Sequence, residues 1–550
     1  MITIKYNPTD LRYIFLYGDE IKQIESHLNK IPQYMFLPSY NGIPKPEVFL
    51  NKFKSKNNKI IYYCHSGLYR EIINFCEKQK IQYEGIDDYF KYRESLNYNE
   101  FIKIIKSWDL NIEPREYQLK AAWLILNYRQ SLSQLATRAG KTLIAYIIFR
   151  YMLEHGAKKI LMIVPSIQLV KQGVEDFKEY KEFFKTESIW AQSEYCDSAN
   201  LTIGTYQSLV QRADKKNKKY NPDFFKDYDV VCIDEAHHLV CKSINTILSL
   251  DFLKNVKIKF GFTGTLPQED TIESFCCQSL MGPKIQDLSA NELIQEGYLA
   301  EPIIKQIRIQ YNEDLTKQYI KFGEYLCSND CVPKTILPKS EQNFTMKYKK
   351  VLPTVLKQLK NTYSDVDYKD YLISLCKSKG SNLLMLEQML VHNSQKHLDI
   401  IKNILKEHHN NFIVFAHHIE YINYIETELK KEFPERLILK ITGSTTIKKR
   451  SEVLKTMLEN SNVILVASYG CCSTGITFKN VEGGIFAQSF KSEIINKQSL
   501  GRLMLRNEDK SKFYLYDLID IFPTKRIYLQ GLAKIKTYKK EAYDVNIINI

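Results

Sequence analysis

The chain has 550 residues, which at about 150 residues per domain predicts three or four domains and excludes a single small module. Apolar residues make up 44% and charged residues 25%, an ordinary globular composition that excludes a disordered chain. The 77 Lys and Arg residues outnumber the 63 Asp and Glu residues, and the net charge of +14 favours a polyanionic partner such as nucleic acid, although it also fits simple solubility.

The residue pattern gives no sign of a membrane or secreted protein. It contains no apolar run of about 18 residues that could span a bilayer. Residues 1–13 lack the basic segment and apolar core of a secretory signal. The 12 cysteines are scattered, which is typical of a reducing compartment. We therefore expect a cytoplasmic protein without a membrane partner.

Residues 1–105 form a first block with a mixed pattern. Runs rich in Ile, Tyr and Phe predict strands at 2–7, 11–17 and 59–64. The apolar spacing of residues 19–30 and 68–80 is that of helices. We interpret this block as a small α+β domain that is able to fold alone.

From residue 106 the pattern changes to strands that alternate with helices. Strand-like runs stand at 131–136, 158–165, 201–206, 229–236 and 257–264, and helical runs stand at 142–153 and 167–180. Near-continuous apolar strands separated by amphipathic helices are typical of a parallel sheet covered on both faces. The pattern predicts a first α/β domain over residues 106–290.

The same alternation returns later and predicts a second α/β domain over residues 406–525. Residues 291–405 are rich in Lys and Tyr and have no clear strand pattern, so we expect a connecting or inserted helical region there. Residues 526–550 have the composition of a basic helical tail.

A phosphate-binding loop is predicted at residues 135–142, between an apolar strand and an apolar helix. Gly140 lets the backbone approach phosphates at a helix N-terminus, Lys141 could reach the β and γ phosphates, and the Thr142 hydroxyl could bind Mg²⁺. The strict pattern has Gly at the first position, where this chain has Leu135. The alternative is a helix that begins with a lysine by chance, and the strand–loop–helix context favours the phosphate site.

A second motif ends another apolar strand with two adjacent carboxylates, Asp234 and Glu235, followed by Ala and His237. Parallel sheets place their ligands at this end of their strands. Asp234 could hold Mg²⁺ through its water shell, and Glu235 could act as the general base on an attacking water. The alternative is an exposed strand end with incidental charge.

The two motifs together resemble those of superfamily 2 DEAH-type helicases, and further segments follow in that family's order. Arg115, Tyr117 and Gln118 resemble the segment that reads adenine. Segments that resemble the remaining motifs stand at 163–172, 204–207, 263–265, 415–417, 473–476 and 498–502.

The form of the phosphate loop and the segments 466–481 and 516–520 are similar to the UvsW family of bacteriophage DNA helicases. The resemblance implies two tandem RecA-like domains, behind a small N-terminal domain that contacts DNA. It implies ATP and Mg²⁺ as cofactors, and ATP-driven remodelling of branched DNA by branch migration, fork regression and R-loop unwinding, in recombination, repair or replication. The expected partners are branched or single-stranded DNA and RNA–DNA hybrids, bound by a monomer in the cytoplasm of a bacterial host.

The resemblance also implies a role for individual residues. The catalytic set would be Lys141, Asp234, Glu235, Gln498, Arg502 and Arg506. The nucleotide would be bound by Arg115, Tyr117, Gln118, Thr137, Gly140, Lys141, Thr142 and Gly475, and the metal by Thr142 and Asp234. The DNA backbone would be contacted by Thr205, Thr263 and Thr474. Packing at a sheet edge or turn is an equal alternative for these three threonines.

Two positions depart from the family's pattern. Arg138 stands where many members have Gly, and we expect its side chain to project into solvent. In the last motif the second arginine is displaced, because Leu505 takes its place and Arg506 follows. We expect a helix from near Glu493 to place Arg502 and Arg506 on one face, with Leu505 packed inward.

Three other functions stay open. An RNA helicase of the DEAH type is one, because the motifs do not show whether a 2′-OH is read. A motor subunit of a restriction or defence system is the second, although we find no clear Asp…Glu-x-Lys nuclease cluster outside the motor. A nucleic-acid-binding protein with an inactive motor is the third, and the presence of Lys141, Asp234 and Glu235 argues against it.

Overall fold

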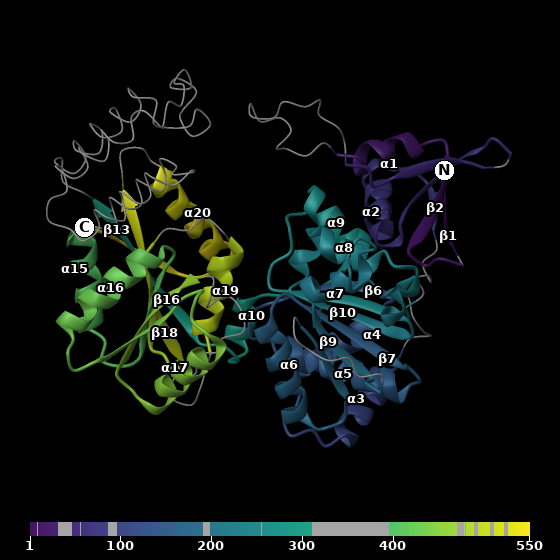
Figure 1. Cartoon of the computed structure of the whole chain (residues 1–550). Helices are drawn as coiled ribbons and strands as arrows, with labels where there is room; N and C mark the ends of the chain where they lie inside the picture. Colours follow the sequence, from purple (N-terminus) through teal and green to yellow (C-terminus); the bar gives the residue numbers. More distant parts are fainter. Residues whose placement is uncertain are drawn as a thin grey trace, which may run out of the picture. The chain divides into compact units, whose positions relative to one another are not determined.

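The computed structural model forms two compact units, Met1–Ser289 and Ala290–Ile550 (Figure 1). It describes residues 1–7, 9–30, 47–55, 57–85, 96–190, 198–254, 256–310, 395–469, 478, 480–488, 493–505, 511–521 and 526–550. Within these ranges, no helix has both the length and the apolar character needed to cross a membrane.

The first unit begins with a small sheet whose strands run in the order β3-β4-β2-β1-β5. The strands are β1 (Ile2–Tyr6), β2 (Tyr13–Gly18), β3 (Asn51–Lys54), β4 (Ile60–His65) and β5 (Tyr83–Glu84). Helices α1 (Ile21–Leu28) and α2 (Tyr69–Gln79) bury their apolar faces against it. The predicted α+β block is confirmed, because alternate strand residues are apolar and one face of the sheet is covered.

This block packs closely against the motor that follows it, and both lie within one compact unit. Phe275 of the motor is fully buried within the core of the N-terminal sheet. A Cβ atom on Gly67 would overlap the motor's backbone at Gln278 O. The helix α3 (Tyr98–Ser107) also crosses the expected boundary at residue 105, because Phe101 packs on Tyr151 of the motor. Long-range packing of this kind leaves no signal in local sequence.

A seven-stranded sheet forms the rest of the first unit, with the order β12-β6-β11-β10-β7-β9-β8 and parallel pairing throughout. Its strands are β6 (Gln130–Leu135), β7 (Lys159–Val164), β8 (Thr186–Ile189), β9 (Leu201–Thr205), β10 (Tyr228–Asp234), β11 (Ile258–Thr263) and β12 (Lys284–Leu288). The accompanying helices are α4 (Glu116–Leu126), α5 (Lys141–Glu154), α6 (Ile167–Tyr180), α7 (Tyr206–Ala213), α8 (Lys242–Leu248) and α9 (Ile272–Met281). The predicted RecA-like parallel sheet is confirmed here.

The second unit contains another seven-stranded parallel sheet, in the order β15-β16-β14-β17-β18-β13-β19. Its strands are β13 (Glu301–Gln310), β14 (Phe412–Ala416), β15 (Leu437–Ile441), β16 (Val463–Ser468), β17 (Gly483–Phe486), β18 (Lys512–Ile521) and β19 (Val545–Asn549). Its helices are α10 (Ala290–Gln295), α15 (Gln395–Lys406), α16 (Ile419–Glu432), α17 (Ile447–Glu459), α19 (Glu493–Leu503) and α20 (Arg526–Lys540).

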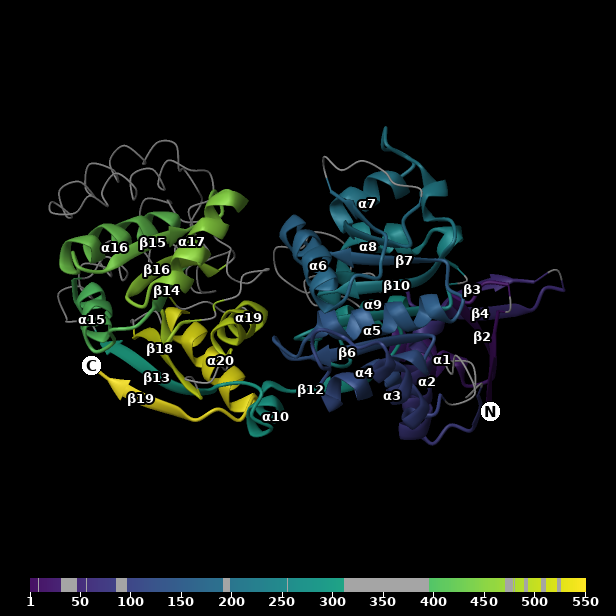
Figure 2. The same cartoon turned by 90° about the horizontal axis from the view of Figure 1, so that it is seen from below.

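Two segments differ from the sequence expectation. Residues 301–310 were expected to lie in a helical region, but they form β13, which pairs with β18 along its whole length. Residues 526–550 are not a tail, because α20 packs on β18 and β19 pairs with β13. Figure 2 shows β13 and β19 side by side. Both strands mix polar and apolar residues, and their partners are distant in sequence, so neither matched the pattern of a buried central strand.

Candidate functional site

The predicted phosphate loop connects β6 to α5, as its motif requires. Both Arg138 and Gly140 have positive φ, at 76° and 75°. This backbone turns the chain sharply and starts α5 at Lys141, directly after Gly140. Gly140 has no side chain that could cap the helix, so the positive end of a fourteen-residue helix faces the loop.

The adenine-reading segment contacts this loop. Gln118 Nε2 and the Tyr117 hydroxyl each donate a hydrogen bond of 3.0 Å to the carbonyl oxygen of Ala139. Gln118 Oε1 accepts a bond of 2.9 Å from the Arg115 backbone N–H, which caps α4. A Cβ atom on Gly140 would overlap Gln118 Nε2. The loop therefore needs glycine at 140 for its backbone angle and for the close approach of Gln118.

The DEAH motif forms a tight turn at the end of β10. Glu235 has φ 56°, a left-handed conformation that costs a non-glycine residue of order 1 kcal/mol or more. Asp234 Oδ1 supports the turn by accepting a 3.0 Å hydrogen bond from the Glu235 N–H. Gly261 on β11 makes room for it, because a Cβ there would crowd Ala236. The turn directs Glu235 back toward the phosphate loop.

A chain of contacts then joins three motifs. Lys141 Nζ lies 3.8 Å from Glu235 Oε1, and both side chains are largely buried. Glu235 Oε2 lies 3.3 Å from His237 Nδ1, and the same nitrogen is 3.0 Å from Thr263 Oγ1. Thr263 in turn accepts from the Thr265 backbone N–H at 3.2 Å. The carboxylate at the centre of the site is thus linked to the segment after β11.

The described residues fit a nucleoside triphosphate with a divalent cation. A helix N-terminus preceded by a left-handed loop, with a lysine at the first helical position, presents positive charge to an anion. Asp234 and Glu235 place two carboxylates at the adjacent strand end, and carboxylate oxygen is the ligand type that hard divalent cations prefer. Thr137 lies beside this loop, close to Gly264.

His237 is a functional residue to which the sequence assigned no role. It lies between Glu235 and Thr263 and is mostly buried. Its position in the DEAH motif was the available signal, but only the tertiary structure shows which strand its imidazole meets. Gln134 was also missed, and it accepts a hydrogen bond of 3.2 Å from the Leu266 N–H.

The threonines expected to contact DNA have other partners. Thr263 is fully buried and bonds to His237. Thr205 is 3% exposed and caps α7, where its hydroxyl contacts the Ser208 hydroxyl at 3.0 Å. For these two residues the structure favours packing at a strand end, the alternative that the sequence left open. Thr474 lies outside the described residues, as does Gly475.

Arg138 does not project freely into solvent as expected. Its side chain is half-buried, and its Nε and Nη2 atoms are shielded from water. A guanidinium in the phosphate loop therefore belongs to the site's positive charge.

In the second unit, the helix predicted to begin near Glu493 is present as α19 and carries Gln498 and Arg502. Arg502 is half-buried, and the side chain of Gln498 lies outside the description. The helix ends at Leu503, and Leu505 forms an antiparallel bridge with Leu299. Extended pairing thus follows α19 at Leu505, and the expectation that Arg506 shares a helical face with Arg502 stays a prediction. Arg506 itself lies outside the described residues.

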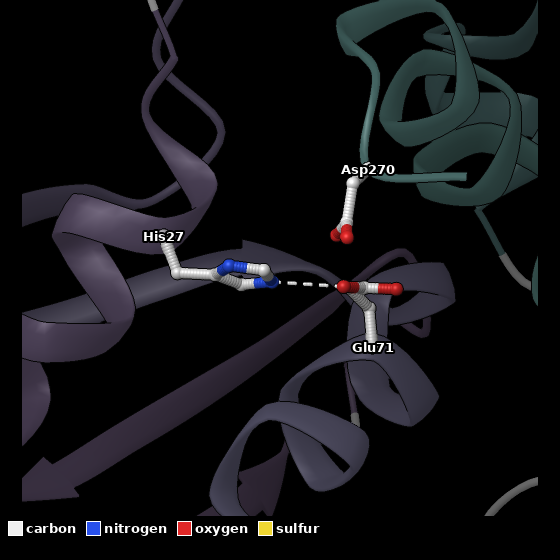
Figure 3. Close-up of side chains that lie close together, drawn as sticks. All are labelled: His27, Glu71 and Asp270. Atoms are coloured by element: carbon white, nitrogen blue, oxygen red, sulfur yellow. Dashed lines mark hydrogen bonds and ion pairs between the residues drawn. The ribbon is translucent and has the colours of Figure 1, made fainter. Parts of the chain in front are cut away.

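A separate cluster lies between the N-terminal block and the motor. His27, Glu71 and Asp270 bring their ligand atoms within 4.8 Å of one another (Figure 3). Glu71 already accepts a hydrogen bond of 2.8 Å from His27 Nε2, and the Lys30 ammonium lies 3.8 Å from the Asp270 carboxylate. Lys30 also bonds to the Asp270 carbonyl oxygen at 2.6 Å. Because a lysine competes with any cation here, we interpret the cluster as a docking contact.

Two protein families match the two motor regions. The family described as "Type III restriction enzyme, res subunit" matches residues 111–268, and "Helicase conserved C-terminal domain" matches residues 395–505. The ATP-dependent DNA helicase uvsW of Enterobacteria phage T4 is 25% identical over 505 residues, which cover 87% of this chain and 86% of that protein.

Two solved structures also align with the chain. The crystal structure of T4 UvsW covers 100% of this chain and 99% of its own, with 21% identity and a TM-score of 0.44. The DNA-bound type ISP restriction-modification enzyme LlaBIII aligns over 87% of this chain and 34% of its own, with 13% identity and a TM-score of 0.51.

The chain is an ATP-dependent helicase, and hence a nucleic-acid-dependent ATPase that uses ATP with a divalent metal. Within that class it is similar to the UvsW helicase of phage T4 over most of both chains.

Proposed function

We propose that the chain is a DNA helicase that remodels branched DNA by branch migration, fork regression and R-loop unwinding. Its similarity to the T4 uvsW helicase over 87% of the chain supports DNA as the substrate. The contacts from Lys141 through Glu235 and His237 to Thr263 carry the motor assignment, because they join the phosphate loop to the segments that respond to nucleic acid in such motors. RNA–DNA hybrids are further substrates in this proposal, and the active form is a monomer in a bacterial host's cytoplasm.

In this proposal Lys141 and the α5 N-terminus bind the triphosphate, while Thr142 and Asp234 hold Mg²⁺. Glu235 orients and deprotonates the attacking water, and its 3.8 Å contact with Lys141 places it beside the phosphate loop. Arg115, Tyr117 and Gln118 bind the base, which the contacts of Tyr117 and Gln118 with Ala139 support. Gln498, Arg502 and Arg506 of the second unit complete the set, as the family resemblance implies.

The test is ATP hydrolysis with no nucleic acid, single-stranded DNA, branched DNA and RNA. Stimulation should be greatest with DNA, and branched DNA should be converted to recombined products only with ATP. Lys141→Ala should abolish hydrolysis, whereas Lys158→Ala, an exposed lysine after the same helix, should not. Hydrolysis at the wild-type rate in Lys141→Ala would refute the site, and stimulation by RNA alone would favour an RNA helicase.

A second candidate is the motor of a restriction system. The match of residues 111–268 to the restriction-enzyme res subunit favours it. Such a motor would translocate on duplex DNA without resolving branches. Translocation that displaces a triplex-forming strand from linear duplex, together with no activity on four-way junctions, would support this candidate over the first.

A further inference from the structure

The N-terminal sheet has one covered and one open face. Helices α1 and α2 lie together on one side of β1 and β2 (Figure 1). The residues that face them are buried or packed in that core: Ile2, Ile4, Ile14, Leu16, Tyr62 and Cys64. Strand residues alternate between faces, so the intervening positions define the open face. These are Thr3, Lys5, Tyr13, Phe15, Tyr17, Asn51, Phe53, Ile61, Tyr63 and His65.

Aromatic rings cover this open face in a continuous row. Register places Phe15 opposite Tyr63 and Phe53 opposite Ile61. The ring of Phe53 lies 6.5 Å from Phe15 and 5.8 Å from Tyr63, and Tyr63 lies 5.8 Å from Tyr13. Phe53 is 44% exposed and Tyr17 38% exposed. Large rings without cover on a sheet are unusual in a monomer and indicate a binding surface.

The charge around the row suits a polyanion. Lys5 Nζ lies 5.9 Å from the centre of the Tyr17 ring on the open face. The β3–β4 hairpin adds Lys59, which is exposed at its end, whereas Lys54 pairs with Ile60 on the other face. From residue 48 to residue 70 the chain contains no Asp or Glu. Among the paired strands, the acidic residue at an open-face position is Glu84, on the opposite edge strand β5.

We propose that this open face binds single-stranded DNA by stacking bases on Phe53, Phe15 and Tyr17, with Lys5 and Lys59 on the phosphates. Aromatic rows flanked by lysines bind single strands without sequence preference, because every base has a face that can stack. The surface rests on the proposed DNA helicase function and deepens it. It would hold a displaced strand on the N-terminal block while the motor acts on the junction.

Phe53→Ala tests the surface, with Tyr6→Ala as its matched control. Tyr6 is 46% exposed in the same sheet, but its register partner is the buried Ile14, so it belongs to the other face. Phe53→Ala should weaken binding of a thymidine oligonucleotide about tenfold, and Tyr6→Ala should not. Lys5→Ala, at an exposed lysine that pairs with Phe15 on the open face, should lower the salt dependence of binding, whereas Phe53→Ala should leave that slope unchanged. ATP hydrolysis without DNA should be unaffected in all three variants.

Phe53→Trp provides a direct readout of stacking. Its fluorescence should be quenched by the oligonucleotide and remain unchanged when inorganic phosphate is added. Equal binding by Phe53→Ala and the wild type, with no quenching in Phe53→Trp, would overturn the proposal. A change in sedimentation mass between Phe53→Ala and the wild type would instead make the face a contact between two chains, and preference for RNA would also overturn it. Loss of DNA-stimulated hydrolysis with intact quenching would overturn the helicase function alone.

Discussion

The buried ion pair between Lys534 and Asp517 allows a quantitative test of whether α20 is part of the core of the second unit. Both side chains are fully buried, and Lys534 Nζ lies 2.7 Å from Asp517 Oδ1. Lys534 also donates to the Gln488 carbonyl oxygen at 3.3 Å, and the Tyr538 hydroxyl donates to Asp517 Oδ2 at 3.1 Å. The Tyr469 hydroxyl reaches the same Gln488 carbonyl at 3.0 Å. The network therefore joins α20 to the ends of three strands.

Lys534→Met should destabilise the second unit by about 3–5 kcal/mol, because it leaves the Asp517 carboxylate buried without its cation. Amides of β17 and β18 should then exchange with deuterium about two to three orders of magnitude faster, which mass spectrometry of the intact chain can measure. The matched control is Lys536→Met, an exposed lysine on the same helix, which should change exchange little. Equal protection in both variants would refute the assignment of α20 to the core.

The pH dependence of the stability of Lys534→Met tests whether charge causes the loss. Burial raises the pKa of Asp517, and Lys534 opposes that shift. In Lys534→Met the pKa should rise further, so the folded state binds a proton that the unfolded state releases. Stability then falls as the pH rises through that window, and the loss should shrink as the pH is lowered toward the raised pKa. A loss that is constant with pH would mean that packing, and not charge, is the cause.

Three further predictions concern the first unit. Gly140→Ala should raise the KM for ATP about tenfold, because the added Cβ would displace Gln118. The control is Gly156→Ala, since Gly156 has a similar φ of 85° but open space around it. Equal effects of the two substitutions in ATP titrations would contradict this reasoning. His237→Ala should weaken the stimulation of hydrolysis by DNA more than hydrolysis without DNA, and a uniform loss in steady-state assays would show that the imidazole does not link the motifs. Phe275→Ala should destabilise the first unit by about 3–5 kcal/mol in urea unfolding, whereas Phe252→Ala, at a side chain that is 38% exposed, should cause almost no change. Wild-type stability in Phe275→Ala would mean that the N-terminal block docks without a shared core.

The sequence by itself determined the two parallel sheets and the local form of the motifs. The runs around β7 and β10 are largely apolar, as strands buried on both faces tend to be, so their positions were readable. Gly140 followed by Lys141 likewise predicted a loop that turns into a helix, because only glycine adopts the left-handed angle at no cost.

Only the tertiary structure decided which distant residues contact one another. β13 and β19 mix polar and apolar residues, and their pairing with each other is set by the sheet and not by any local pattern. The end of α19 at Leu503 is followed by a bridge between Leu505 and Leu299, which no local pattern indicated. The contact of His237 with Thr263 and the burial of Phe275 in the N-terminal core also join residues far apart in the chain. Such contacts are fixed by packing energy shared across elements, which residue type and spacing do not specify.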